Sequence, residues 1–520
     1  MAGRWYIYTD FGCNVSNSIC SRTIVANTHY IGKASCPIHM GCFAASLSDC
    51  SPVRCVISEA LTFNGHIVIW YQHVFVICHA FSVVFEGNRD NWCSRLMKTA
   101  SMKIKDNFDC VHRSKFYYHV LTWKFFISFE FVFVQFLFAG RYKADPRFSW
   151  FPIDITLFFF LISFLSGMFI LKKNQFAIRR DNISFIVSGL LFFGYCLVSL
   201  LWSPGEIYAT QKTLYFCILT LWTFLACSLV IGVESVRVVR FFVAWVLMSI
   251  WIAIEAYMAY SSSSGILGVG VMGGNYLGVG RTVGPASLLL LTVAIYSNMH
   301  KIIKLACLSW VVFGSYILLV IGGRGPFIAV AVPVLLIGLL TFSFRQGVYK
   351  NKGFFIIFLI AIFGGFYLNH LLDSDYVPVT LRRLMLLFGN DIGNSAVERL
   401  HFIKDSINYW VSAPILGHGI GSWPILNNGS DVRGYPHNVF LEVIVEFGII
   451  GFLLLIGFIV KSISNLVRDD RLRYDPIILA IVMFLMNTFI NSLFSGDLPD
   501  NRYLFGVLGL TIYRSVGDHI

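Results

Sequence analysis

The sequence contains a succession of apolar runs long enough to cross a lipid bilayer, and these runs limit the possible folds more than any other feature. They lie near residues 121–139, 150–171, 183–203, 213–233, 241–260, 282–299, 304–321, 326–344, 354–370, 438–461, 476–494 and 503–514. Such segments must be helical, because lipid offers no partner to backbone N–H and C=O groups. The composition agrees, since 57% of the 520 residues are hydrophobic and only 13% are charged. We therefore predict an all-α polytopic membrane protein with about 12 transmembrane helices of roughly 20 residues each.

The distribution of lysine and arginine predicts how these helices are oriented. If both ends of the chain are cytoplasmic, the inner loops hold fifteen of these residues: Lys172, Lys173, Arg179, Arg180, Arg237, Arg240, Lys301, Lys304, Arg345, Lys350, Lys352, Lys461, Arg468, Arg471 and Arg473. The short outer loops then hold seven: Arg141, Lys143, Arg147, Lys212, Arg281, Arg324 and Arg502. This excess follows the positive-inside rule and makes residues 371–436 one large extracytoplasmic loop. The net charge of +12 fits this topology and an anionic ligand, and we predict no nucleic-acid binding.

The first 110 residues differ from the rest of the chain. They contain nine of the thirteen cysteines but no CxxC pair and no recognisable signal peptide. We treat residues 1–110 as an atypical cysteine-rich extension and residues 121–515 as the polytopic domain. A metal or disulfide domain and a further span at 66–86 are alternatives. Translation from Met97 or Met102 is another, so whether residues 1–96 are translated is left open.

Four arginines lie where predicted spans reach the outer face, namely Arg281, Arg324, Arg399 and Arg433. Arginine can form two parallel hydrogen bonds with a phosphate, and neighbouring glycines let a ligand approach the backbone. Each arginine alone could be an interfacial anchor. Together they predict that an anionic, lipid-linked head group binds at the outer interface.

The segment 435–460 carries the strongest local pattern. Pro436 favours a helix start and places His437 at the N-terminal end of the helix, where the dipole disfavours an imidazolium. His437 would therefore stay neutral and able to accept a proton, although an interfacial belt residue is the alternative. Asn438, Glu442 and Glu446 form a polar stripe below it, and carboxylates inside a span usually face protein or a water-filled cavity.

These residues resemble the O-antigen ligase family of polytopic glycosyltransferases, whose relatives include O-antigen and exopolysaccharide polymerases. The family signature is His, then Asn, Ser or Gln, nine residues, Gly, two residues and Gly. Here it reads His437-Asn438, nine residues, then Gly448-Ile-Ile-Gly451. Three positions after the last glycine, the family sometimes has Gly, Thr or Tyr. This chain has Leu454 there and so departs from the pattern. The Arg324-Gly325 turn and the stretch PILGHGIGSW at 414–423 also resemble the family, and the resemblance covers roughly residues 150–515.

The resemblance implies a GT-C-like enzyme of the bacterial inner membrane whose active site faces the periplasm. Such an enzyme moves a glycan from undecaprenyl diphosphate to an acceptor hydroxyl, which belongs to lipid A–core for a ligase. We predict that Arg281 and Arg324 hold the diphosphate as negative charge develops, and that His437 is the general base. Arg399, Arg433, Asn438 and Glu442 are predicted to bind substrate.

Two other functions stay open. A polymerase would use the same residues with a second lipid-linked repeat unit as acceptor, and a transporter of lipid-linked sugar or another anion is a third possibility. Arginines can replace a divalent metal in a diphosphate clamp, so we predict no cofactor, no metal and no nucleotide. Beside the four outer-face arginines, the only candidate for a metal site is the weak Asp373/Asp375 pair.

Overall fold

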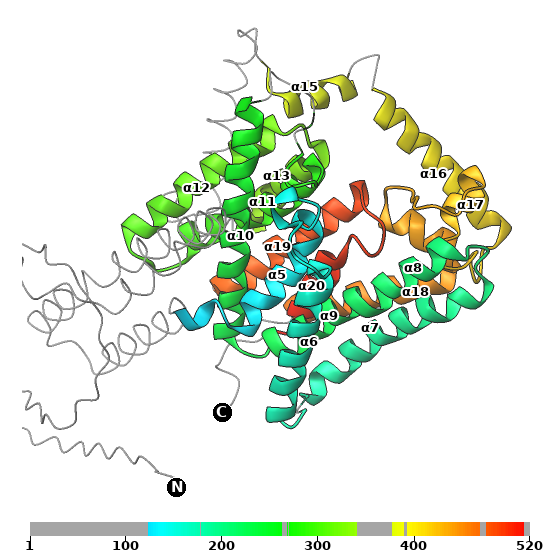
Figure 1. Ribbon diagram of the computed structural model, residues 1–520, viewed down its shortest axis with the longest axis horizontal. Coiled ribbons are helices and arrows are strands. Elements are labelled where there is room, and N and C mark those ends of the chain that lie inside the picture. Colours follow the sequence, from blue (N-terminus) through cyan, green and yellow to red (C-terminus); the bar gives the residue numbers. More distant parts are fainter. Residues whose placement is uncertain are drawn as a thin grey trace, which may run out of the picture. The chain divides into compact units, whose positions relative to one another are not determined.

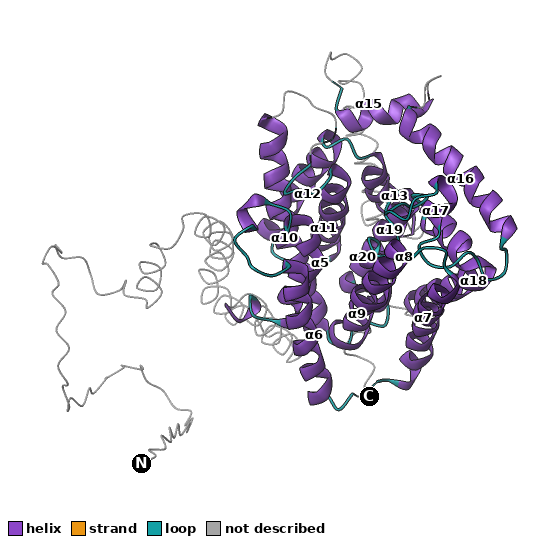
Figure 2. Ribbon diagram, turned by 45° about the vertical axis from the view of Figure 1, so that its right-hand side comes forward, coloured by secondary structure: helices purple, strands orange, loops and turns teal. Residues whose placement is uncertain are grey.

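The computed structural model describes residues 123–176, 178–262, 268, 270–340, 377–388, 393–467 and 475–513, all of which belong to one compact unit within 69–520. Every regular element in these residues is helical (Figure 2), and the only β-type pairing among them is an isolated bridge between Val271 and Gly274. The all-α class predicted from the apolar runs is confirmed. The cysteine-rich extension, the run at 354–370 and the Asp373/Asp375 pair lie outside the described residues.

Eight helical segments among the described residues are long and apolar enough to cross a membrane. They are α6 (Ile155–Lys173), α7 (Arg180–Val198) with the turn that continues it to Trp202, the composite helix Ile207–Ile231, α10 (Ser235–Ser262), α11 (Tyr276–Tyr296), α12 (Lys301–Val320), α18 (Val439–Val467) and α19 (Pro476–Phe494). In the composite helix, one π-helical stretch (Tyr215–Thr220) joins α8 (Ile207–Leu214) to α9 (Leu221–Ala226), and a second (Cys227–Ile231) follows α9. The protein is therefore a multi-pass membrane protein.

Three other predicted spans form shorter helices. α13 (Arg324–Leu340) has 17 residues, α5 (Phe129–Tyr142) has 14 and α20 (Arg502–Leu510) has nine. At 1.5 Å per residue, a helix like α20 cannot cross a hydrocarbon core of about 30 Å alone. Its apolar residues are instead buried against α9 and α19, which is why the sequence pattern resembles a span. The total of twelve spans and the GT-C-like arrangement stay predictions.

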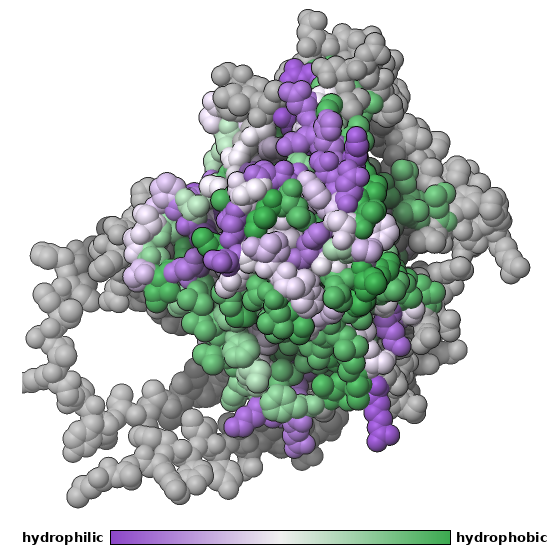
Figure 3. Space-filling model, turned by 90° about the vertical axis from the view of Figure 1, so that its right-hand side faces the viewer, coloured by the Kyte–Doolittle hydropathy of each residue, from purple (hydrophilic) through white to green (hydrophobic). Residues whose placement is uncertain are grey.

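Figure 1 shows the helices of the bundle, which differ in how deeply they are buried. α11 is the most buried of the eight spans and packs against α10, α12, α13 and α19. α6 and α12 are the least buried, and they expose large apolar residues such as Leu165, Phe169 and Val312. Figure 3 shows a band of hydrophobic residues with polar residues on either side of it. Apolar residues all around a helix are typical of a helix that faces lipid.

The predicted outer loop 371–436 is mostly helical where the structure describes it. It contains α15 (Val379–Met385), α16 (Asn394–Ser412) and α17 (Trp423–Asn428). α15 is joined to the turn between α12 and α13, because the hydroxyl of Thr380 accepts from the Gly322 N–H at 3.0 Å and donates to the Leu318 carbonyl at 2.8 Å. α16 packs on α18 and so connects this loop to the last part of the chain.

Candidate active site

The site is organised around a break in α18. Gly448 has φ 61° and ψ −162°, so the helix is interrupted there and its backbone groups lose their usual partners. The segment after α16 supplies new ones: Pro414 accepts from the Ile449 N–H at 2.9 Å, and the Gly419 N–H donates to the Glu446 carbonyl at 2.8 Å. Irregular backbone inside a membrane protein is tolerated where protein groups satisfy it in this way. The stretch 414–423 is therefore part of the helical bundle.

The glycines of this stretch are required by conformation and by space. Gly417, Gly419 and Gly421 all have positive φ, between 71° and 89°. A β-carbon on Gly417 would collide with the backbone at Gly448, and one on Gly419 would lie 2.6 Å from the Ser203 Cα. Residues with a side chain rarely adopt such angles, so only glycine lets the loop approach both helices closely.

His437 lies immediately before α18 in the left-handed conformation, with φ 59°. Its ring stacks on Phe402 of α16 at a centroid distance of 5.9 Å and contacts Tyr435 at 4.5 Å. Its Nδ1 is buried and has no hydrogen-bond partner among the residues that the structure describes. A strained backbone that carries an unsatisfied polar atom is typical of functional positions.

The surroundings of His437 keep its imidazole neutral. Burial lowers the pKa of His437 below its ordinary value of 6.5, and the positive charge of Arg399 lowers it further. Glu398 opposes this shift, and Arg281 adds to it. Asn438 caps the helix directly after His437, because its side-chain oxygen Oδ1 accepts from the Phe440 N–H at 2.9 Å. Its amide also donates to the Leu493 carbonyl at 3.1 Å. The structure thus shows the amide of Asn438 bonded to backbone.

Arg324 and Arg399 lie in one cationic cluster together with Arg383 of α15. Arg324 begins α13 and donates to the Arg383 carbonyl at 3.2 Å and to the Ser395 hydroxyl at 3.3 Å. The charges of Arg399 and Arg383 both act on Arg324, and Arg383 lies over the ring of Tyr276 at 5.3 Å. No acidic side chain of the described residues forms an ion pair with any of these three arginines. A cationic cluster without acids favours an anionic ligand.

Arg281 also acts on His437 but belongs to a different helix, α11. It lies within α11 and not in an outer loop as predicted, because the helix begins at Tyr276. Its guanidinium donates to the Ser495 carbonyl and, at 3.5 Å, to the Asn491 carbonyl at the end of α19. Within the described part of the chain it also lacks an acidic partner at ion-pair distance. The charges of Arg281 and Arg399 act on His437, and that of Arg399 also acts on Arg324, so these four residues lie in one region. Their roles stay predictions.

Arg433 differs from these arginines because it is paired with acids. Its Nε lies 3.1 Å from Asp497 and its Nη2 lies 2.6 Å from Asp500. Burial disfavours its charge, but the two carboxylates outweigh this effect and raise its pKa above the ordinary value. Its guanidinium also lies 5.6 Å from the ring centre of Tyr435. Arg433 thus connects the segment before His437 to the turn after α19.

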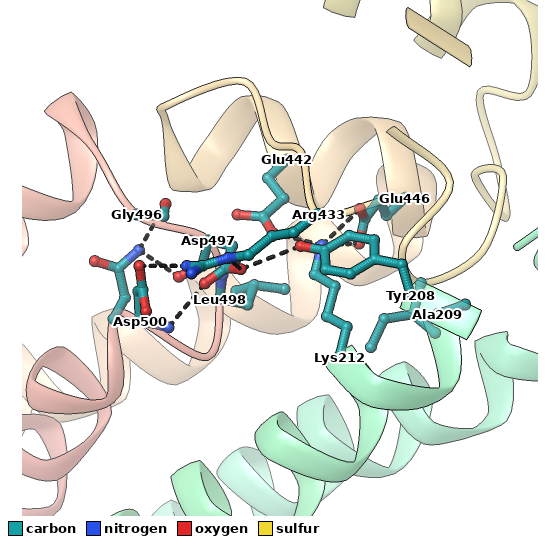
Figure 4. A network of polar contacts seen from close by, with 12 residues as sticks. Tyr208, Ala209, Lys212, Arg433, Glu442, Glu446, Gly496, Asp497, Leu498 and Asp500 are labelled. Carbon is teal, nitrogen blue, oxygen red and sulfur yellow. Dashed lines mark hydrogen bonds and ion pairs between the residues drawn. The ribbon is translucent and has the colours of Figure 1, made fainter. Parts of the chain in front are cut away.

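Glu442 belongs to a buried ion-pair network (Figure 4). Lys212 of α8 lies 2.6 Å from Glu442 and 2.6 Å from Glu446, and all three side chains are fully buried. The Leu498 N–H donates to Glu442 at 3.1 Å, and Tyr208 donates to Asp497 at 3.1 Å. The assignment of Lys212 to an outer loop is wrong, because the helix starts at Ile207 and carries the lysine into the bundle.

This site can now be compared with known proteins. Residues 309–456 match the family model described as O-Antigen ligase. The predicted resemblance to the O-antigen ligase family is confirmed. The matched region begins in α12 and includes Arg324, Arg399, His437 and the break in α18. No curated protein matches the chain.

The geometry explains each part of the O-antigen ligase signature. His437 presents the imidazole, Asn438 caps the helix, and Gly448 forms the break that receives the loop 414–423. Gly451 is required because a β-carbon there would collide with Phe447. The nine residues between Asn438 and Gly448 in the signature therefore form the part of α18 between its N-terminal cap and its break.

Several neighbours were missed by sequence reasoning. Arg383, Lys212, Asp497, Phe402 and Tyr435 join the site through contacts between distant segments. Lys212 could have been found, because two carboxylates inside one span require a cation. The others carry no local signal. Among the described residues no three His, Cys, Asp or Glu side chains gather as metal ligands, so the absence of a metal stays a prediction.

Proposed function

We propose that this protein is a glycosyltransferase that moves a glycan from undecaprenyl diphosphate to an acceptor hydroxyl. The match to the O-antigen ligase family supports an O-antigen ligase or polymerase type of function in general. The observation that carries the proposal is the juxtaposition of an unsatisfied, neutral imidazole at His437 with arginines that have no acidic partner. A proton acceptor beside a cationic clamp is what this reaction requires.

The proposed reaction is a displacement at the anomeric carbon. The acceptor oxygen forms a bond to that carbon while the bond to the diphosphate oxygen breaks, and undecaprenyl diphosphate leaves. His437 takes the proton of the acceptor hydroxyl. Arg324, Arg399 and Arg281 stabilise the charge that develops on the diphosphate. Arg383 lies beside Arg324. A single displacement inverts the configuration of the sugar.

Arg433, Asn438 and Glu442, which were predicted to bind substrate, support this site from outside. Their side chains bond to Asp497 and Asp500, to backbone groups and to Lys212 respectively. We therefore assign them the role of positioning His437 and the helix that carries it. The arginine clamp also leads us to propose that the reaction needs no divalent metal, so the rate should persist in excess EDTA. A loss of rate that Mg²⁺ or Mn²⁺ restores would contradict this.

We propose a ligase that uses lipid A–core in the bacterial inner membrane, with the site facing the periplasm. The intact histidine signature favours it, and a polymerase is the second candidate. A lipopolysaccharide gel of a deletion strain separates the two. Loss of all long-chain bands with accumulated lipid-linked polymer supports a ligase, whereas bands with a single repeat unit support a polymerase.

The role of His437 is tested with purified protein and the lipid-linked glycan that accumulates in the deletion strain. His437→Ala should reduce the release of undecaprenyl diphosphate by about 10²–10⁴-fold, the usual contribution of general-base catalysis. Donor binding should survive, because the base acts mainly in the transition state. His437→Tyr is the control for a belt residue, and near-normal turnover in that variant would end the catalytic assignment.

A further inference from the structure

The helix α16 presents three distinct faces. Phe402 and Tyr409 point inward and contact Trp423, each with ring centroids 5.7 Å apart, and Ser406 between them is fully buried. A second face consists of exposed apolar residues, namely Val397, Leu400, Ile403, Ile407 and Val411. His401 and Asn408 are exposed on a third, polar face.

The apolar face is continuous along the helix. Its residues recur every three or four positions, which places them on one side of a 3.6-residue helix. Between 41% and 66% of each of these side chains is exposed. Lys404 lies within this face, four residues after Leu400 and three before Ile407. Its long stem can lie along apolar surface while the ammonium reaches a polar region. A large exposed apolar face of this kind marks a binding surface.

The register against α18 shows how deep this helix reaches. Phe402 stacks on His437, and twelve residues further along both segments Pro414 accepts from the Ile449 N–H at 2.9 Å. The two segments therefore run side by side in the same direction. Ile449 lies ten residues beyond Val439, the first residue of the span α18, which is roughly 15 Å along a helix. That is about half of the hydrocarbon thickness.

We propose that α16 is inserted in the leaflet where α18 begins, with the face from Val397 to Val411 against the acyl chains of membrane lipids. At the C-terminal end of α16, the Trp410 carbonyl accepts from the Ala413 N–H at 3.1 Å and the Tyr409 carbonyl lies 2.9 Å from the His418 ring Nε2. The segment that follows is bonded to the break in α18 through Pro414, so this end has backbone partners, as a helix that ends within the membrane requires. The inward face carries Phe402 to His437, and Arg399 acts on both His437 and Arg324. α16 is thus the wall that separates lipid from the candidate active site.

The proposal is tested by photocrosslinking the full chain in proteoliposomes. The photoreactive residue p-benzoylphenylalanine replaces Leu400, Ile407 or Val411 in three separate variants, and the bilayer contains phosphatidylethanolamine with an alkyne on its acyl chains. His401 and Asn408 are matched controls, because each directly follows a tested residue and so lies at nearly the same depth about 100° around the helix. Leu453, an exposed position in the span α18, is the positive control.

We expect labelled lipid at positions 400, 407 and 411 at a yield close to that at 453, and loss of this adduct at 401 and 408. Three tested positions guard against a variant that does not fold, which thermal unfolding of each purified protein would reveal. Adducts with a second copy of the chain would show that this face binds protein. Absence of lipid adducts at folded variants, or equal adducts on both faces, would also overturn the proposal.

Discussion

The two charged regions of this protein are built in opposite ways. Around Lys212, every carboxylate has a cation nearby, and Glu442 and Glu446 both lie 2.6 Å from the same ammonium. Around His437, the arginines Arg324, Arg383 and Arg399 form no ion pair with an acidic side chain of the described residues. Their contacts there are with backbone carbonyls, the Ser395 hydroxyl and the Tyr276 ring. In the first region every charge has a partner, whereas in the second the described residues supply no anion for the arginines.

This difference suggests a division of work along α18. A buried charge without a partner costs several kcal/mol, so the complete network fixes the fold in one arrangement. An incomplete cationic cluster at the end of the same helix stabilises little by itself and is suited to binding a diphosphate. Substitutions in the first region should therefore affect stability, and substitutions in the second should affect turnover or donor binding.

The largest effect should come from Lys212→Met, because it leaves two carboxylates buried without a cation. We expect a loss of about 3–5 kcal/mol in the free energy of unfolding, measured by denaturant titration in mixed micelles. The matched control adds Glu442→Gln and Glu446→Gln, which should recover much of this loss by removing the unpaired charges. If Lys212→Met unfolds like the unchanged protein, the network is not what holds α8 against α18.

Arg324→Lys should show the opposite behaviour. Lysine keeps the charge but loses the planar group that makes two parallel hydrogen bonds, and a hydrogen bond to a charged group contributes about 1.5–3 kcal/mol. We expect donor affinity to fall roughly 10–100-fold at unchanged thermal stability, measured with the lipid-linked donor. A variant that unfolds easily but binds the donor normally would assign Arg324 to the fold.

The pH dependence should reveal the neutral state of His437. Because burial, Arg399 and Arg281 lower its pKa, the acid limb of kcat/KM should have its midpoint below pH 6.5. A general base is active above its pKa, so the rate should fall as the pH decreases through this midpoint. Arg399→Gln should raise the midpoint, because it removes a positive charge that opposes protonation. Each midpoint is determined relative to the plateau rate of the same variant. If Arg399→Gln leaves the midpoint unchanged, a group other than His437 controls the acid limb of kcat/KM.

Arg433→Gln should have the smallest effect of the four. Arg433 is 54% exposed and Asp500 is 42% exposed, so solvent screens this pair. The buried Asp497 keeps its hydrogen bonds from the Tyr208 hydroxyl and the Asp500 N–H, so we expect a loss of stability of only about 1 kcal/mol. Donor affinity should change less than in Arg324→Gln, which is measured alongside it. A larger loss of donor affinity in Arg433→Gln than in Arg324→Gln would show that Arg433 also binds the donor. It would contradict the distinction between paired and unpaired arginines.

Much of the fold could be predicted because the bilayer restricts what each segment can do. An apolar run of sufficient length must be helical, and the run predicted at 476–494 has the same limits as α19. α20 shows where this reasoning ends, since a helix buried by protein and a helix facing lipid have similar composition. The arginines and His437 were found because charged and titratable residues are rare in such a sequence and stand out at the ends of runs.

The sequence by itself determined the membrane class and the O-antigen ligase signature, and it supplied the residues predicted to hold a diphosphate and take a proton. The tertiary structure decided which charges are already paired, because ion pairs such as Lys212 with Glu446 join residues 234 positions apart. It also decided that Gly448 breaks a helix and that the loop 414–423 fills the break. Local patterns specify helices and their ends, but partners for buried polar groups come from distant segments that only packing brings together.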